Sequence, residues 1–111
     1  MEKTRNNVYV ATYCQNSYQR ERIEKFVNTA CIKLLNKGFE KSQSLLEKAK
    51  EVWIVLGKGQ LHWLVSKLIS YEEHTAINLG ISVRYFKINY RGKYVGKTRE
   101  VERGELPSLL V

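Results

Sequence analysis

The stretch VWIVLGKGQLHWLVSKLISYEEHTAINLG, residues 52–80, decides the fold. It begins with an apolar run without polar alternation, 52–56, which is typical of a β-strand covered on both faces. Two glycines around Lys58 then end the strand and open a helix, and Gly80 is a natural residue at the end of that helix. The apolar side chains of the helix recur every three or four residues, at Leu61, Leu64, Val65, Leu68 and Ile69.

A similar strand-and-helix unit precedes this stretch. VYVATYC, residues 8–14, is rich in β-branched and aromatic residues and predicts a strand. The sequence Asn36-Lys37-Gly38 predicts the end of the helix that follows. The apolar positions of this helix form one stripe, at Ile23, Phe26, Val27, Ala30, Cys31, Leu34 and Leu35.

Three shorter elements complete the pattern. Ser44 and Glu47 resemble a capping box, which predicts a brief helix within 39–50. Residues 81–90 predict a strand, and its apolar set changes face near Tyr85-Phe86, which indicates a bulge or a strong twist. The last four residues, 108–111, are apolar and predict a final short strand.

This alternation predicts an α/β chain of the two-layer α+β kind, in the order β-α-(α)-β-α-β-β. We expect a mixed four-stranded sheet with two helices on one face. A single domain spans residues 1–111, with residues 1–6 as a flexible basic N-terminus. No apolar run approaches the roughly 18 residues that a membrane span needs. The polar N-terminus also lacks the apolar segment of a signal peptide, so we expect a soluble intracellular protein.

The charge balance is the unusual feature of the composition. Nineteen Lys and Arg against eleven Asp and Glu give a formal net charge of +8, and the isoelectric point is near 9.6. Such a charge on a small domain attracts polyanions, because each neutralised phosphate releases counterions. Membrane surfaces and acidic proteins are attracted as well, so charge alone does not choose the partner.

The basic residues concentrate in RYFKINYRGKYVGKTR, residues 84–99. This segment has six basic side chains and no acidic one, interleaved with aromatic rings that stack on bases or sugars. An exposed hairpin kept soluble by lysines is the alternative interpretation, although a solvated face usually mixes signs. We therefore predict a nucleic-acid contact here, made by Arg84, Lys87, Tyr90, Arg91, Lys93, Tyr94, Lys97 and Arg99.

The junction Gly57-Lys58-Gly59 is a second candidate. A helix N-terminus carries unpaired N–H donors and a positive dipole, so an anion is favoured there, and Lys58 adds a full charge. The spacing matches neither a dinucleotide fingerprint nor a P-loop. A tight turn without any ligand uses the same glycines, and the local sequence does not choose between the two interpretations.

Nothing in the sequence predicts catalysis. His62 and His74 are twelve residues apart, whereas a metal-binding pair on one helix is separated by three or four. The chain has no Asp, and its glutamates show no catalytic pairing, so we predict no enzyme activity, metal or cofactor. Cys14, in a predicted strand, and Cys31, in a predicted helix, are interpreted as small buried side chains in a reducing compartment.

The opening Asn7-Val8-Tyr9-Val10, the strand VWIVLGKG and the helix QLHWLVSKLISY resemble the Alba superfamily of small basic chromatin and RNA-binding proteins. The resemblance covers roughly residues 5–111 and implies the order strand, helix, strand, helix, strand, strand, and a dimer. It also implies that Lys58 contacts the nucleic-acid backbone from a loop. Lys87, Arg91, Lys93, Lys97 and Arg99 would line a hairpin arm. The 39–50 insertion and the short last strand depart from the family pattern.

The sequence thus predicts a non-catalytic nucleic-acid-binding protein, acting as a homo- or heterodimer without a membrane or a small-molecule substrate. A protein–protein module, regulatory or viral, whose basic hairpin meets an acidic partner is the alternative. The expected location is cytoplasmic, nucleoid-associated for an archaeal protein or nuclear for a eukaryotic relative. DNA and RNA, and single and double strands, are not distinguished at this point.

Overall fold

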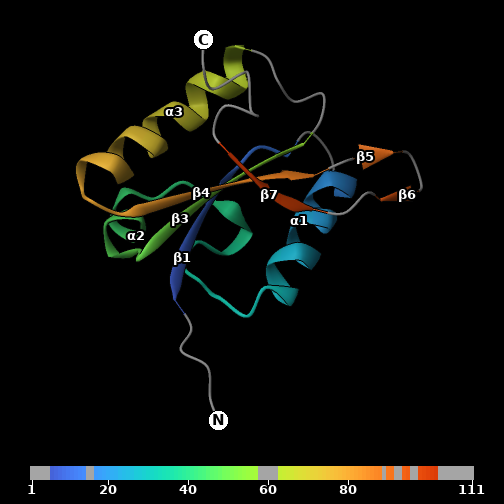
Figure 1. The fold of residues 1–111 in the computed structure, drawn as a ribbon, viewed down its shortest axis with the longest axis horizontal. Helices are drawn as coiled ribbons and strands as arrows, with labels where there is room; N and C mark the ends of the chain where they lie inside the picture. The colour runs from blue at the N-terminus through green and yellow to red at the C-terminus, as the bar shows by residue number, and fades with distance from the viewer. Residues whose placement is uncertain are drawn as a thin grey trace.

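The computed structural model describes residues 6–14, 17–57, 63–88, 90–91, 94–95 and 98–102 (Figure 1). Within them, the main sheet has five strands in the order β2-β1-β3-β4-β7. The first four are parallel to one another, and β7 pairs antiparallel with β4. The strands are β1 (Asn7–Thr12), β2 (Lys33–Leu34), β3 (Glu51–Gly57), β4 (Ser82–Ile88) and β7 (Arg99–Val101).

Three α-helices and a 3₁₀ turn connect these strands within the described residues. They are α1 (Ser17–Thr29), η1 (Lys37–Phe39), α2 (Gln43–Lys48) and α3 (Trp63–Asn78). A separate two-stranded hairpin, β5 (Tyr90–Arg91) and β6 (Tyr94–Val95), lies between β4 and β7 in the chain. The mixed sheet with helices confirms the predicted α+β class.

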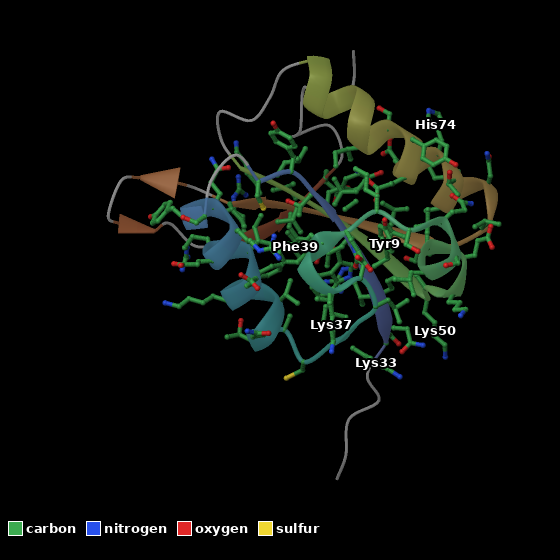
Figure 2. The ribbon with its side chains drawn as sticks, turned by 180° about the vertical axis from the view of Figure 1, so that it is seen from behind. Tyr9, Lys33, Lys37, Phe39, Lys50 and His74 are labelled. Carbon is green, nitrogen blue, oxygen red and sulfur yellow. The ribbon has the colours of Figure 1, made fainter. Side chains whose placement is uncertain are left out.

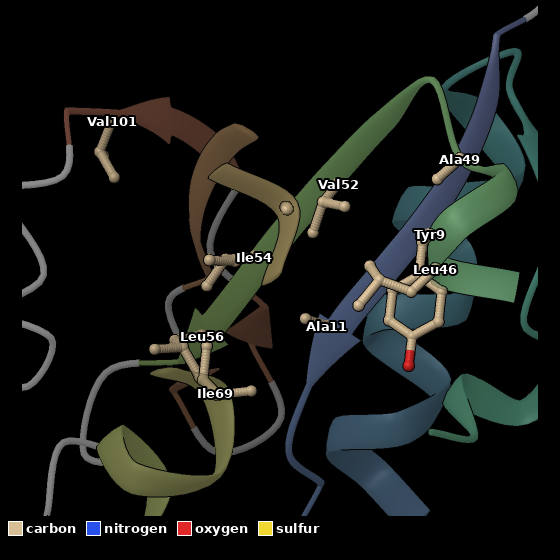
Figure 3. Close-up of a cluster of buried hydrophobic side chains, with 10 residues drawn as sticks. Tyr9, Ala11, Leu46, Ala49, Val52, Ile54, Leu56, Ile69 and Val101 are labelled. Atoms are coloured by element: carbon tan, nitrogen blue, oxygen red, sulfur yellow. The ribbon is translucent and has the colours of Figure 1, made fainter. Parts of the chain in front are cut away.

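The helices cover both faces of the sheet, and each face has its own apolar core. Tyr9 and Ile54 pack with Ile69 of α3 and Leu46 of α2 on one face (Figure 3). On the other face, the neighbouring residues of the same strands pack against α1: Val8, Val10, Trp53 and Val55 with Ile23 and Val27. We call these the α3 face and the α1 face.

The arrangement differs from the predicted four strands with two helices on one face. From β1 the chain passes through α1 to β2, and from β2 through α2 back across β1 to β3. Because the two moves run in opposite directions along the sheet, crossovers of the same right hand place α1 on one face and α2 and α3 on the other. Two strands of the main sheet were not predicted: β2, which has only two residues, and β7, which lies before the predicted last strand 108–111.

The first helix is shorter than its apolar stripe predicts, and the bulge in 81–90 is absent. Helix α1 ends at Thr29, Cys31 takes a positive φ of 55°, and the apolar Leu34 belongs to β2. β4 pairs with β3 in unbroken register from Ser82 to Ile88. Its apolar side chains change face because both faces are covered: Val83 and Tyr85 face α3, while Phe86 and Ile88 face α1.

Other local predictions have clearer outcomes. β3 is buried from Val52 to Leu56, as expected for a strand covered on both faces. The brief helix within 39–50 is confirmed as α2, but its N-cap is Ser42 rather than Ser44. Gly80 ends α3 with a φ of 74°; its N–H donates to Ile77, and the next N–H donates to Ala76, the pattern of a Schellman cap.

Two predictions fall on residues outside the described part of the chain: the strand 108–111 and most of the N-terminus 1–6. Among the described helices, none is long and apolar enough to cross a membrane.

Candidate nucleic-acid interface

The described ends of β3 and β4, which precede Lys58 and the basic hairpin in the sequence, lie side by side in the sheet. Gly57, the last residue of β3, and Ile88, the last residue of β4, are register partners in the parallel pair. Lys58 is the next residue in the sequence after Gly57 and lies outside the described residues. The pairing brings together two predicted sites that are about thirty residues apart in sequence.

Lys87 and Arg99 are direct neighbours at the base of the basic segment. They are cross-strand partners in the antiparallel β4–β7 pair. They share the α3 face with Tyr85 and Val101, because side chains alternate along a strand. Like charges opposite each other repel and cost folding free energy.

Arg84 lies on the opposite, α1 face. Its guanidinium lies over the rings of Trp53 and Phe86, 5.1 and 5.3 Å from their centroids. Its Nε and Nη2 donate to the Glu100 carboxylate at 2.9 and 2.6 Å. Its Nη1 lies 3.5 Å from Glu51 Oε1. The hydrogen bond from Arg84 lowers the pKa of Glu100, and the bond to Glu100 raises the pKa of Arg84. Arg84 therefore shares its charge with two carboxylates of the same chain.

The rest of the predicted contact set belongs to the hairpin. Tyr90 pairs with Val95, and Arg91 pairs with Tyr94. The backbone of Tyr90, Arg91 and Tyr94 is thus placed in β5 and β6, while their side chains, and Lys93 and Lys97 entirely, lie outside what the structure describes. Figure 1 shows the hairpin projecting from the sheet beside α1.

The winding of the sheet adds a feature that the sequence analysis did not identify. β1 and β3 are adjacent, and the chain leaves their carboxyl ends toward opposite faces, into α1 and α3. In open α/β sheets, ligands bind outside the carboxyl ends of the strands at such a reversal point. Lys58 follows one of these two ends. Only the strand order reveals this, and strand order has no local sequence signal.

A second missed feature is a hollow of about 500 Å³ between α1 and the start of β7. Its described lining is Arg22, Lys25, Phe26, Thr29 and Thr98. The apolar stripe in the sequence assigned Phe26 to the core and gave no sign of a hollow between α1 and residue 98. Such a contact between distant segments depends on tertiary packing.

Three buried titratable side chains away from this region, Tyr9, Glu72 and Glu73, make structural contacts. Glu72 is 3% exposed, and its Oε1 lies 2.6 Å from Lys41 Nζ. Glu73 is 2% exposed and accepts a hydrogen bond from the Tyr85 hydroxyl. Burial raises the pKa of Tyr9 above its usual value. These contacts tie α3 to β4 and to the segment before α2.

The remaining candidates from the sequence are two histidines and two cysteines. His74 is exposed on α3 (Figure 2), as expected of a surface histidine, and His62 lies outside the described residues. Cys14 follows β1 and is partly buried, whereas Cys31 is exposed in the turn after α1, so its prediction as a buried helical residue is wrong. No group of three or more potential metal ligands occurs among the residues that the structure covers.

Comparison of the chain with protein-family models, curated proteins and solved structures finds no match.

Proposed function

We propose that this protein binds nucleic acid, DNA or RNA, through the phosphate backbone and without catalysis. The observation that carries the proposal is the register pairing of Gly57 with Ile88. Because of this pairing, the strand ends that precede Lys58 and the basic hairpin are neighbours in the sheet. A polyanion that contacts the hairpin would therefore pass the loop as well.

The chemistry of the segment supports phosphate contacts. Six of the nineteen basic residues fall within sixteen positions, 84–99. Lys87 and Arg99 adjoin each other at its base, and each phosphate that such cations neutralise releases counterions. Arg84 is expected to contribute less than Lys87, because Glu51 and Glu100 already neutralise part of its charge.

The Alba resemblance is a separate argument for the same activity. The described elements follow the order strand, helix, strand, helix, strand, strand once the segment from β2 to α2 and the hairpin β5–β6 are set aside. The departure is α1, which packs on the face opposite α3. The proposal therefore rests on the basic residues that follow the carboxyl ends of β3 and β4 in the sequence, rather than on the family architecture. Association with a second subunit, and a cytoplasmic, nucleoid or nuclear location, belong to the same proposal.

Fluorescence anisotropy with matched duplexes and single strands of DNA and RNA, over a salt series, tests the proposal. The test variant is Lys93→Glu/Lys97→Glu in the hairpin. The control is Lys37→Glu/Lys50→Glu, which makes the same charge change at exposed residues near the other end of the sheet (Figure 2). Lys50 immediately precedes β3, whereas the hairpin follows the carboxyl end of β4.

The wild type is expected to lose affinity steeply with salt. The hairpin variant should flatten the slope of log K against log salt by about two, one for each lysine that no longer neutralises a phosphate, and the control should leave it nearly unchanged. Equal losses of affinity in both variants would place binding over the whole basic surface. A wild type that binds none of the four nucleic acids would refute the proposal and favour an acidic protein partner.

A further inference from the structure

The hollow beside α1 combines basic and aromatic groups in one place. Lys25, Phe26 and Thr29 come three, four and seven residues after Arg22, so the four residues form a single stripe of α1. Thr98, immediately before β7, closes the other side. Of the described residues lining this hollow of about 500 Å³, two are cationic and none is acidic.

Phe26 supplies an aromatic surface held at a fixed position. Its ring centroid lies 5.1 Å from that of Phe86 and 5.8 Å from that of Trp53, and those two rings lie 4.7 Å apart. Trp53 and Phe86 are buried, whereas Phe26 is only partly buried and lines the hollow. A ring supported from behind in this way loses little conformational entropy when a planar group stacks on it.

Lys25 and Thr29 line the hollow together with Phe26 and supply polar groups. Lys25 is exposed, and its ammonium is free to rotate toward an anion. The Thr29 hydroxyl donates to the Phe26 carbonyl at 2.9 Å, which leaves its lone pairs available as acceptors. The hollow thus offers cations for a phosphate, an aromatic face for a base, and an acceptor for a base N–H or sugar hydroxyl.

We propose that this hollow binds one nucleotide of a single-stranded nucleic acid, with its phosphate at Arg22 and Lys25 and its base against Phe26. The inference rests on the proposed nucleic-acid binding and adds to it a contact that only unpaired strands make. The volume is within the range of small-molecule sites, about 300–1,000 Å³. A base inside a duplex is stacked and paired, so it cannot enter the hollow without being extruded.

The position of the hollow links it to the hairpin. Thr98 directly precedes Arg99, and Arg99 pairs with Lys87 at the base of the basic segment. Figures 1 and 2, seen from opposite sides, both show the hairpin beside α1. A strand held by the hairpin therefore continues directly to α1, where one of its bases is captured.

An uncharged substitution that fills the hollow distinguishes binding at this site from general electrostatic attraction. Thr29→Trp introduces a large side chain at the edge of the hollow, and Asn28→Trp places the same side chain on an exposed position that does not line it. Lys25→Glu tests the phosphate contact, with Lys48→Glu on α2 as its matched charge control. Circular dichroism and thermal melting establish that each variant is folded.

Anisotropy with 5′-labelled dT6, U6 and a 12-base-pair duplex, at fixed salt, gives the readout. Thr29→Trp is expected to weaken hexamer binding by about tenfold, within the contribution of one base stack, and to leave duplex binding unchanged. Lys25→Glu should weaken hexamer binding more than Lys48→Glu does. Unlabelled dTMP and UMP, followed by NMR, should shift the amides of residues 22–29 and 98.

The outcomes distinguish this inference from the proposed function. If Thr29→Trp and Asn28→Trp bind the hexamers like the wild type, the nucleotide site is refuted, while loss of binding in Lys93→Glu/Lys97→Glu still supports the hairpin. If the mononucleotides shift the α1 amides but no polymer binds, the hollow is a site for free nucleotides and the proposed function fails. If neither occurs, both are overturned.

Discussion

Asn36 is a fully buried polar residue whose side chain continues the hydrogen bonding of an edge strand. The Leu35 N–H donates to the Val8 carbonyl at 2.9 Å. One step further along β1, the Asn36 side chain accepts from the Val10 N–H at 2.9 Å and donates to the Val10 carbonyl at 2.8 Å. The side-chain amide therefore satisfies the next pair of backbone groups, where β2 itself has ended.

Replacing Asn36 by alanine is expected to lower the free energy of unfolding by about 2 to 4 kcal/mol, because two buried backbone groups of Val10 lose their partners. Urea denaturation measures the change. Asn28→Ala, at an exposed position on α1, should alter stability by less than about 0.5 kcal/mol. A loss of stability at Asn36 no larger than that of this control would show that water replaces the amide.

The sequence pattern predicted a helix end at Asn36-Lys37-Gly38, and the structure shows why that interpretation is incomplete. Leu34 packs on the α1 face and Leu35 on the α3 face, which is the two-residue period of a strand. The same two residues also extend the three-and-four spacing of α1, so a helix and a two-residue strand have one local signal here. The competing contacts come from β1, more than twenty residues away, and local periodicity does not contain them.

At the scale of elements, Tyr9 attaches the segment before α2 to the sheet. Its hydroxyl accepts from the Ser42 N–H at 3.1 Å and donates to the Glu40 carbonyl at 3.4 Å. The residue is 1% exposed, and burial raises the pKa of its phenol above the usual value. The folded protein therefore keeps a proton that the unfolded chain releases at about pH 10.

This difference predicts that stability falls as pH rises above about 10, because the unfolded state then binds fewer protons than the folded state. The expected contribution of Tyr9 is a slope of up to about 1.4 kcal/mol per pH unit. Urea midpoints between pH 9 and 11 measure it, and Tyr9→Phe should show the shallower slope. Parallel curves for the two proteins would mean that Tyr9 ionises without unfolding.

The long strand β3, the long helix α3 and the brief helix α2 were predictable from local patterns, whereas the shortest strand of the main sheet was not. The buried run of β3 and the Gly80 end of α3 follow from local composition and backbone conformation. The two-residue β2 and the second covered face depend on where distant segments pack. The same division holds for the candidate interface: the basic residues of 84–99 are evident in the sequence, whereas the Gly57–Ile88 pairing and the hollow at Thr98 require the sheet order.

For the whole molecule, the exposed apolar side chains of α3 and its end bear on association. Tyr71, Ile77 and Leu79 are 63%, 57% and 50% exposed. Large apolar side chains grouped on one element favour a protein contact. They lie on the α3 side of the sheet, whereas the hollow lies on the α1 side, so an α3 contact would leave the hollow accessible.

We predict a dimer, with twice the 13.0-kDa mass of one chain, that Ile77→Glu weakens by placing a charge in the contact. Sedimentation equilibrium over a concentration series, with nucleic acid removed, measures the mass. Ser82→Glu, an exposed position of β4, is the matched control. A wild type that remains monomeric at every concentration would exclude α3 as a self-association surface.

The position of β1 inside the sheet has a consequence for synthesis. β1 leaves the ribosome before the other strands of the described sheet, yet it lies between β2 and β3, and its pairing with β3 joins Val8 to Glu51 and Thr12 to Val55. The side of β1 that pairs with β3 therefore has no partner until residue 55 has been translated. During that interval an apolar strand, later covered on both faces, is held in the nascent chain without its principal neighbour. By contrast, β3, α3 and β4 follow one another directly in the chain. The two strands whose ends carry the candidate interface are therefore translated late and within a short interval of each other.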